Sequence, residues 1–119
     1  MTLLLISLFG ALGCCVRYIF EYAVRRNHPT IRPWATVAAN GLGTGIAGYA
    51  AYRLVGTSDA HLHSIVLTGF CGGLTTFSSA LAVPVILQRE HHRGYSVALI
   101  TVTPLLCSGM FLLGMTLAH

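Results

Sequence analysis

Long uncharged apolar runs alternate with short polar segments along the whole chain. A helix needs about 20 mainly apolar residues to cross the hydrocarbon core of a bilayer, and four runs reach that length. They cover roughly residues 3–24, 34–53, 64–87 and 96–118. Little sequence is left over for a soluble domain. The pattern predicts an all-α membrane protein in which residues 1–119 form a single domain of four transmembrane helices.

The third run is interrupted at residues 69–79 by the stretch Gly-Phe-Cys-Gly-Gly-Leu-Thr-Thr-Phe-Ser-Ser. Glycine costs backbone order in a helix, and hydroxyl groups find no hydrogen-bonding partner in hydrocarbon. Non-helical backbone at membrane depth survives only where protein buries it or where it lines a watery or ion-filled cavity. The stretch therefore predicts a third helix that is broken near its middle, at a functional site.

A polar stripe runs along the second apolar run. Thr36, Asn40 and Thr44 are spaced four residues apart, which places their side chains on one helical face. An amide exposed to lipid is costly, so this face should meet protein or a pore. Hydrogen bonding between packed helices is the alternative to a pore role.

Arg17 lies about two turns before the end of the first run. An arginine at that depth is expensive unless it snorkels to the interface or faces a wet vestibule, which makes it a candidate functional residue. Glu21 follows four residues later on the same helical face, so an ion pair between the two side chains is the alternative. The sequence leaves both interpretations open.

Composition and charge narrow the class of protein. Only 8% of the residues are charged and 55% are hydrophobic, which is a membrane composition. The basic residues are all arginine, and five of the seven lie in or beside the first and third loops, against one beside the second. By the positive-inside rule, loops 25–33 and 88–95 are expected to be cytoplasmic, with both termini outside the plasma membrane. The five arginines are Arg25, Arg26, Arg32, Arg89 and Arg93.

Several functional classes fit poorly. An enzyme is disfavoured because the sequence shows no paired carboxylates, no nucleophile with an evident base and no complete metal-ligand set. A small multidrug exporter needs a carboxylate near the bilayer centre, whereas the only acidic residue inside a span is Glu21, near its end. An exporter and a non-conducting assembly subunit nevertheless remain as alternatives.

Residues 69–78 resemble the third-helix signature of the Fluc (CrcB) family of fluoride channels. The set Thr36, Asn40 and Gly43 resembles that family's second helix, and a Gly-x-x-Gly-x-x-x-Arg-Tyr pattern ending at Tyr18 resembles its first helix. The likeness thus extends over essentially the whole chain. It implies a fluoride-selective channel that works as an antiparallel dimer, lets fluoride leave the cytoplasm passively and so reduces fluoride toxicity.

The resemblance also implies site residues. The pore-lining candidates are Asn40, Phe77, Ser78, Thr76, Thr36 and Thr103. The edge of the Phe77 ring would face the anion, and hydroxyl groups would replace its water. Arg17 would make an aqueous vestibule attractive to anions. The main-chain carbonyls of Gly72 and Thr75 would hold a structural Na⁺ at the centre of the dimer.

One position departs from the family pattern. The second phenylalanine of the fluoride path would fall at position 80, where this chain has Ala80. The one-sided arginine distribution also fixes a single orientation, and a chain with one orientation cannot supply its own inverted partner. Together these features predict a dimer with a homologous subunit of opposite orientation, which contributes the missing ring. A homodimer is the alternative.

Overall fold

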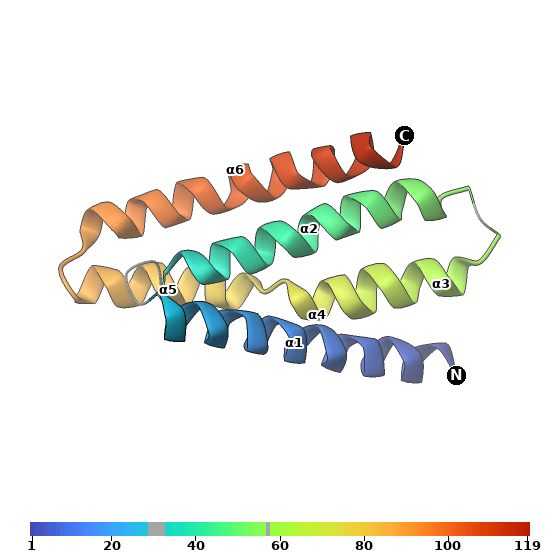
Figure 1. Cartoon of the computed structure of the whole chain (residues 1–119), viewed down its shortest axis with the longest axis horizontal. Coiled ribbons are helices and arrows are strands. Elements are labelled where there is room, and N and C mark those ends of the chain that lie inside the picture. The colour runs from blue at the N-terminus through green and yellow to red at the C-terminus, as the bar shows by residue number, and fades with distance from the viewer. Residues whose placement is uncertain (29–32, 57) are drawn as a thin grey trace.

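The computed structural model describes residues 1–28, 33–56 and 58–119. The chain passes back and forth four times, and both termini lie at the same end of an elongated bundle that measures 51 × 29 × 23 Å (Figure 1). The third passage is broken near its middle, as predicted. The elements are α1 (Thr2–Asn27), α2 (Trp34–Leu54), α3 (Ala60–Ser64), the π-helical η2 (Ile65–Cys71), α4 (Gly72–Leu74), α5 (Phe77–Arg89) and α6 (Arg93–Ala118).

Three of the described passages are long and apolar enough to cross a membrane, namely Thr2–Asn27, Ala60–Arg89 and Arg93–Ala118. The helix α2 has 21 residues and spans about 30 Å, yet it does not reach the same hydropathy. It is rich in small and polar residues, and nine of its residues are buried by neighbouring elements. The second of the four predicted spans is therefore the least apolar, and its polar stripe faces protein and the pocket described below.

Close glycine contacts hold the bundle together. A Cβ atom on Gly73 would collide with the main-chain carbonyl of Gly10, so α1 packs directly against the third passage. A Cβ atom on Gly48 would collide in the same way with the carbonyl of Phe111, which joins α2 to α6. In lipid the hydrophobic effect adds little between helices, so such close backbone approach is a main source of packing energy. The contacts set α2, α6 and the broken passage at fixed positions around the site.

Candidate functional site

The break in the third passage lies at Thr75 and Thr76, which both have extended backbone. The main-chain N–H and the hydroxyl of Thr75 both donate to the carbonyl of Cys71, each at 2.9 Å, and end the helical segment there. The hydroxyls of Thr76 and Ser78 share a hydrogen bond of 2.9 Å where α5 begins. The predicted break is thus confirmed at two adjacent residues, between α4 and α5.

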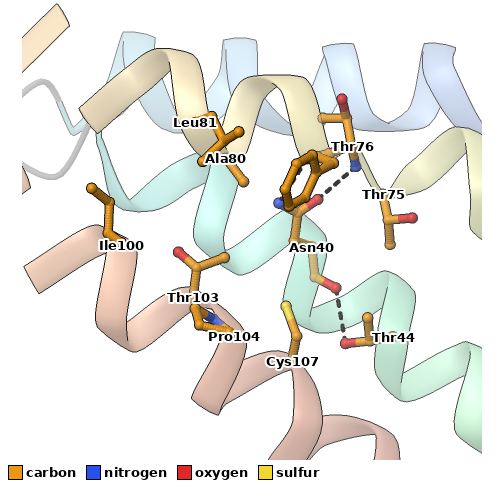
Figure 2. Close-up of a pocket in the computed structure, with 11 residues that line it drawn as sticks. Asn40, Thr44, Thr75, Thr76, Ala80, Leu81, Ile100, Thr103, Pro104 and Cys107 are labelled. Atoms are coloured by element: carbon orange, nitrogen blue, oxygen red, sulfur yellow. Dashed lines mark hydrogen bonds between the residues drawn. The ribbon is translucent and has the colours of Figure 1, made fainter. Parts of the chain in front are cut away.

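Asn40 of α2 holds this break in place. Its side-chain oxygen Oδ1 accepts from the main-chain N–H of Thr76 at 2.8 Å, and its Nδ2 donates to the Thr76 carbonyl at 3.3 Å. The two bonds replace those that Thr76 would make in a continuous helix, and only 5% of Asn40 is exposed. A buried amide is tolerated when its polar atoms are paired, so the side chain and the break stabilise each other. Figure 2 shows the first of these bonds as a dashed line to Thr76.

A pocket of about 340 Å³ opens beside this contact. Figure 2 shows that α2, α5 and α6 contribute its wall, with Asn40 and Thr76 on one side and Thr103 and Cys107 on the other. The wall is mainly apolar and carries isolated amide and hydroxyl groups. No Asp, Glu, Lys or Arg of the described part of the chain lines it. The lining residues are Asn40, Thr44, Thr75, Thr76, Phe77, Ala80, Leu81, Ile100, Thr103, Pro104 and Cys107.

Most of the threonine hydroxyls in this wall already donate hydrogen bonds within their own helices. Thr44 donates to main-chain carbonyls of its own helix at 3.0 Å, and Thr103 donates to the Leu99 carbonyl at 2.6 Å. Two donors remain. The Asn40 amide has a second N–H, because an NH₂ group donates twice, and one proton of the Thr76 and Ser78 hydroxyl pair has no acceptor within that pair. The pocket therefore offers a few neutral donors and no fixed charge.

The start of α5 adds a further favourable field. The first main-chain N–H groups of an α-helix lack partners within the helix, and its N-terminus carries a partial positive charge. In this structure α5 begins at Phe77, which is one of the residues that line the pocket. An anion in the pocket would lie close to this helix end. The arrangement suits a weakly held anion.

Two carbonyl groups at the break are freed from helical bonding. The Thr76 N–H that would donate to the Gly72 carbonyl in a continuous helix donates to Asn40 instead. Thr75 is extended, so its carbonyl also leaves the helical ladder. Carbonyl oxygens are suitable ligands for a hard cation such as Na⁺, and these two groups fit the predicted sodium ligands chemically. A cation would need further oxygen ligands from outside this pair.

The arginines differ in their ion-pair partners and in their positions along the bundle. Glu21 pairs with Arg25 at 3.5 Å, so the expected alternative of a pair between Arg17 and Glu21 is not formed. Within the described residues Arg17 has no hydrogen-bond or ion-pair partner, and it is half-buried. Arg89 lies in the last turn of α5 and Arg93 begins α6, at the end of the bundle opposite the termini (Figure 1). Arg32 lies outside the described residues.

The structure brings most of the predicted site residues together, but not all of them. Asn40, Thr75, Thr76, Phe77 and Thr103 share the pocket, whereas Thr36 is buried deeper, in a small void between α2, α5 and α6. The Phe77 residue is 79% exposed, so most of its ring is uncovered in the single chain.

Sequence reasoning missed part of the pocket wall. Leu81 and Ile100 line the pocket, and neither carries a chemical signal that sequence reasoning could use. Cys107 also lines it, four residues after Thr103, and its helical spacing was the available clue. Pro104 lies inside α6, which continues from Arg93 to Ala118.

Similarity to known proteins identifies the family. The family model described as "CrcB-like protein, Camphor Resistance (CrcB)" matches residues 4–115. The fluoride-specific ion channel FluC of Sulfurovum sp. (strain NBC37-1) is 33% identical over 115 residues, covering 97% of this chain and 91% of the relative. Two channels of Bifidobacterium longum (strain NCC 2705) also match: FluC 1 is 35% identical over 115 residues, with 87% of each chain covered, and FluC 3 is 34% identical over 89 residues, with 74% of each covered. The chain therefore belongs to the CrcB-like family, a fluoride channel family of multi-pass membrane proteins and not of enzymes.

Proposed function

We propose that this chain is one subunit of a fluoride-selective channel that lets fluoride leave the cytoplasm passively. The observation that carries the proposal is the Asn40 amide, which is clamped to the broken helix at Thr76 and keeps one N–H free beside the pocket. The fluoride-specific channels among the relatives support the same substrate.

Neutral donors suit rapid permeation. Conduction requires binding that is favourable enough for entry and weak enough for release. The free Asn40 N–H, the Thr76 and Ser78 hydroxyl pair and the start of α5 offer partial positive charge without a fixed cation. The ring of Phe77 would add a positive edge and exclude bulk water. Thr103 would face the ion from α6, and Thr36 would line the deeper end of the path.

A passive pore is sufficient for the biological task. Hydrogen fluoride crosses a membrane as a neutral molecule and dissociates inside, so an open path for the anion lowers the internal fluoride concentration. A proton-coupled exporter would need a carboxylate at the site. The described residues that line the pocket include none, which favours the channel over the exporter. A non-conducting assembly subunit remains the second candidate, because Ala80 leaves the pocket without a second aromatic ring.

Dimerisation and sodium are part of the same proposal. The carbonyls of Gly72 and Thr75 offer two oxygen ligands, and hard cations of this size take more, so a second subunit would complete the set. The structural Na⁺ would then lie on the axis of an antiparallel dimer. The exposure of Phe77 supports the same arrangement, because its ring is free to meet a partner.

The partner would be a homologous chain of opposite orientation. Four described arginines, Arg25, Arg26, Arg89 and Arg93, lie at the end of the bundle away from the termini, whereas Arg53 alone ends α2 at the other. This bias supports cytoplasmic loops at 25–33 and 88–95 and termini outside. One Bifidobacterium longum strain has relatives numbered FluC 1 and FluC 3, so two chains of this family can occur in one strain.

Arg17 is proposed as the charge of an aqueous vestibule. Its guanidinium has no ion-pair partner among the described residues, because Glu21 pairs through Oε2 with Arg25 and not with Arg17. An unpaired charge inside a span is expensive unless water reaches it. A vestibule at Arg17 would satisfy the guanidinium and raise the local concentration of anions.

Fluoride efflux from liposomes tests the proposal. The chain is reconstituted alone and then together with a homologous subunit of opposite arginine bias, and the release of fluoride and of chloride is followed with ion-selective electrodes. We expect fluoride release from the pair and little chloride release. Release from the chain alone at the same rate would keep the channel and remove the heterodimer. Folded protein that releases no fluoride in either preparation would favour the assembly subunit.

A further inference from the structure

A second groove lies between α2 and α6, apart from the pocket at Asn40. It is a groove of about 220 Å³ between the C-terminal halves of the two helices, lined by Ile46, Tyr49, Leu113 and Leu117 among others. The backbones of Gly45 and Gly114 touch beneath it, since a Cβ atom on Gly114 would collide with the Gly45 carbonyl. Because glycine has no side chain, Gly45 and Gly114 leave an open apolar groove on the surface.

A cation stands at one end of this groove. The guanidinium of Arg53 lies over the Tyr49 ring, 5.7 Å from its centroid, one helical turn beyond the groove. This contact orients the guanidinium, because an aromatic face attracts a cation. Arg53 is exposed, and no carboxylate of the described residues lies within ion-pair distance of it. Its charge is therefore available to an anion from outside the chain.

The dimensions match one leaflet of a bilayer. From Arg53 to Leu42, the lining residue farthest from it on α2, the helix rises by about 16 Å, which is roughly half of the 30 Å hydrocarbon thickness. Arg53 is in the last turn of α2, where the interface with water is expected. The charged end thus lies at headgroup depth and the apolar groove runs inward from it.

The groove faces away from the candidate pore. At about 100° per residue, Tyr49 points roughly 180° away from Asn40 on α2. A partner subunit that completes the pocket at Asn40 need not cover the opposite face. That face is left to the membrane, whose lipids carry both a phosphate and acyl chains.

The structure assigns this groove to a phospholipid with an anionic headgroup, whose phosphate binds Arg53 and whose acyl chain lies along Tyr49 and Ile46. An arginine close to the membrane surface strengthens the binding of anionic lipids. The apolar groove holds the acyl chain of a lipid whether its headgroup is anionic or zwitterionic. Arg53 therefore gives headgroup selectivity and the groove gives general affinity. The inference rests on the membrane fold and holds whether or not the pore conducts.

Native mass spectrometry in detergent tests the assignment, with dioleoyl-phosphatidylglycerol as the anionic probe and dioleoyl-phosphatidylcholine as the zwitterionic one. We expect the wild-type protein to bind phosphatidylglycerol more tightly. Arg53→Gln should weaken that binding about fivefold and weaken phosphatidylcholine binding less, because choline offsets the charge of its phosphate. The matched control is Arg93→Gln, an exposed arginine at the opposite end of the bundle. Exposed Arg53 packs against no core residue, so its variant keeps the fold, which circular dichroism verifies.

A second variant tests the groove itself. Ile46→Trp fills it and should weaken the binding of both lipids, whereas Leu105→Trp, at a position that is exposed and outside the groove, should not. Two results would overturn the assignment. One is phosphatidylglycerol binding that Arg53→Gln does not change. The other is an Ile46→Trp protein that binds both lipids normally but loses its dimer, which would make the groove an interface between chains.

Discussion

Replacement of Asn40 by alanine perturbs the link on which the site depends. The side chain makes two hydrogen bonds to the main chain of Thr76, at 2.8 and 3.3 Å, across 36 residues of sequence. Asn40→Ala removes both, so the Thr76 N–H and carbonyl lose their partners at the helix break. The variant should therefore lose both stability and fluoride flux.

The two losses have different sizes. A buried polar group left without a partner costs about 1–3 kcal/mol. Thr76 is half-buried beside a pocket that water can enter, so the lower figure applies to each group, and the free energy of unfolding should fall by about 2 kcal/mol. A hydrogen bond to a charged acceptor is worth about 1.5–3 kcal/mol, so losing the free Asn40 N–H should slow fluoride flux about 10- to 100-fold.

Two further variants separate these effects. Asn40→Asp keeps an acceptor for the Thr76 N–H, so it should lose less unfolding free energy than Asn40→Ala does. It removes the donor and places an acid in the path, so its fluoride flux should be at least as low as that of Asn40→Ala. Thr44→Ala is the control, because its hydroxyl bonds only to carbonyls of its own helix. It should change stability by less than about 0.5 kcal/mol. Denaturant unfolding in detergent and liposome efflux measure the two quantities. An Asn40→Ala protein with unchanged stability and flux would refute the role of this side chain.

Three further predictions concern packing, the missing ring and sodium. Gly48→Ala should destabilise the protein by about 1–3 kcal/mol, because the new Cβ atom meets the Phe111 carbonyl. Gly109→Ala has open space around it and should stabilise the protein by about 0.5–1 kcal/mol. Equal unfolding free energies for the two variants would contradict the close contact between α2 and α6 at Gly48. Ala80→Phe should raise the ratio of fluoride to chloride flux of the chain reconstituted alone, since the pocket of about 340 Å³ has room for a ring; a ratio at or below that of the wild type would argue against a division of labour between subunits. Replacing Na⁺ with N-methylglucamine should lower the melting temperature and the dimer fraction, because a ligand that binds only the assembled state stabilises it. Identical melting curves in both buffers would contradict a structural sodium ion.

The helix break was predictable because its residues are chemically unusual for their depth. Glycines and hydroxyl residues in the middle of a membrane span leave few options, and the structure breaks the helix at Thr75 and Thr76. The stripe through Asn40 was predictable for the same reason, since helical spacing fixes which side chains share a face. Its hydrogen-bonding partner was not, because the main chain of Thr76 offers the same groups as any other residue.

Other features depend on tertiary contacts that the sequence does not encode locally. The shielding of α2 follows from how α6 and the third passage pack around it, and an apolar-run count treats all four runs alike. The choice of Arg25 over Arg17 as the partner of Glu21 depends on side-chain direction, because both are four residues away on the same helix. The apolar residues Leu81 and Ile100 have no mark that separates a pocket wall from a lipid-facing surface.

The most direct test of the central claim is the reversal potential of the current across a planar bilayer that contains the channel. With a tenfold gradient of fluoride that is balanced by an impermeant anion, and with equal cation and chloride concentrations, a passive fluoride pore predicts a reversal potential of about 59 mV, the value for one elementary charge. It also predicts that Asn40→Asp reduces the current without moving the reversal potential toward that of chloride. A current that reverses near 0 mV, or that follows the proton gradient instead of the fluoride gradient, would contradict a fluoride-selective channel.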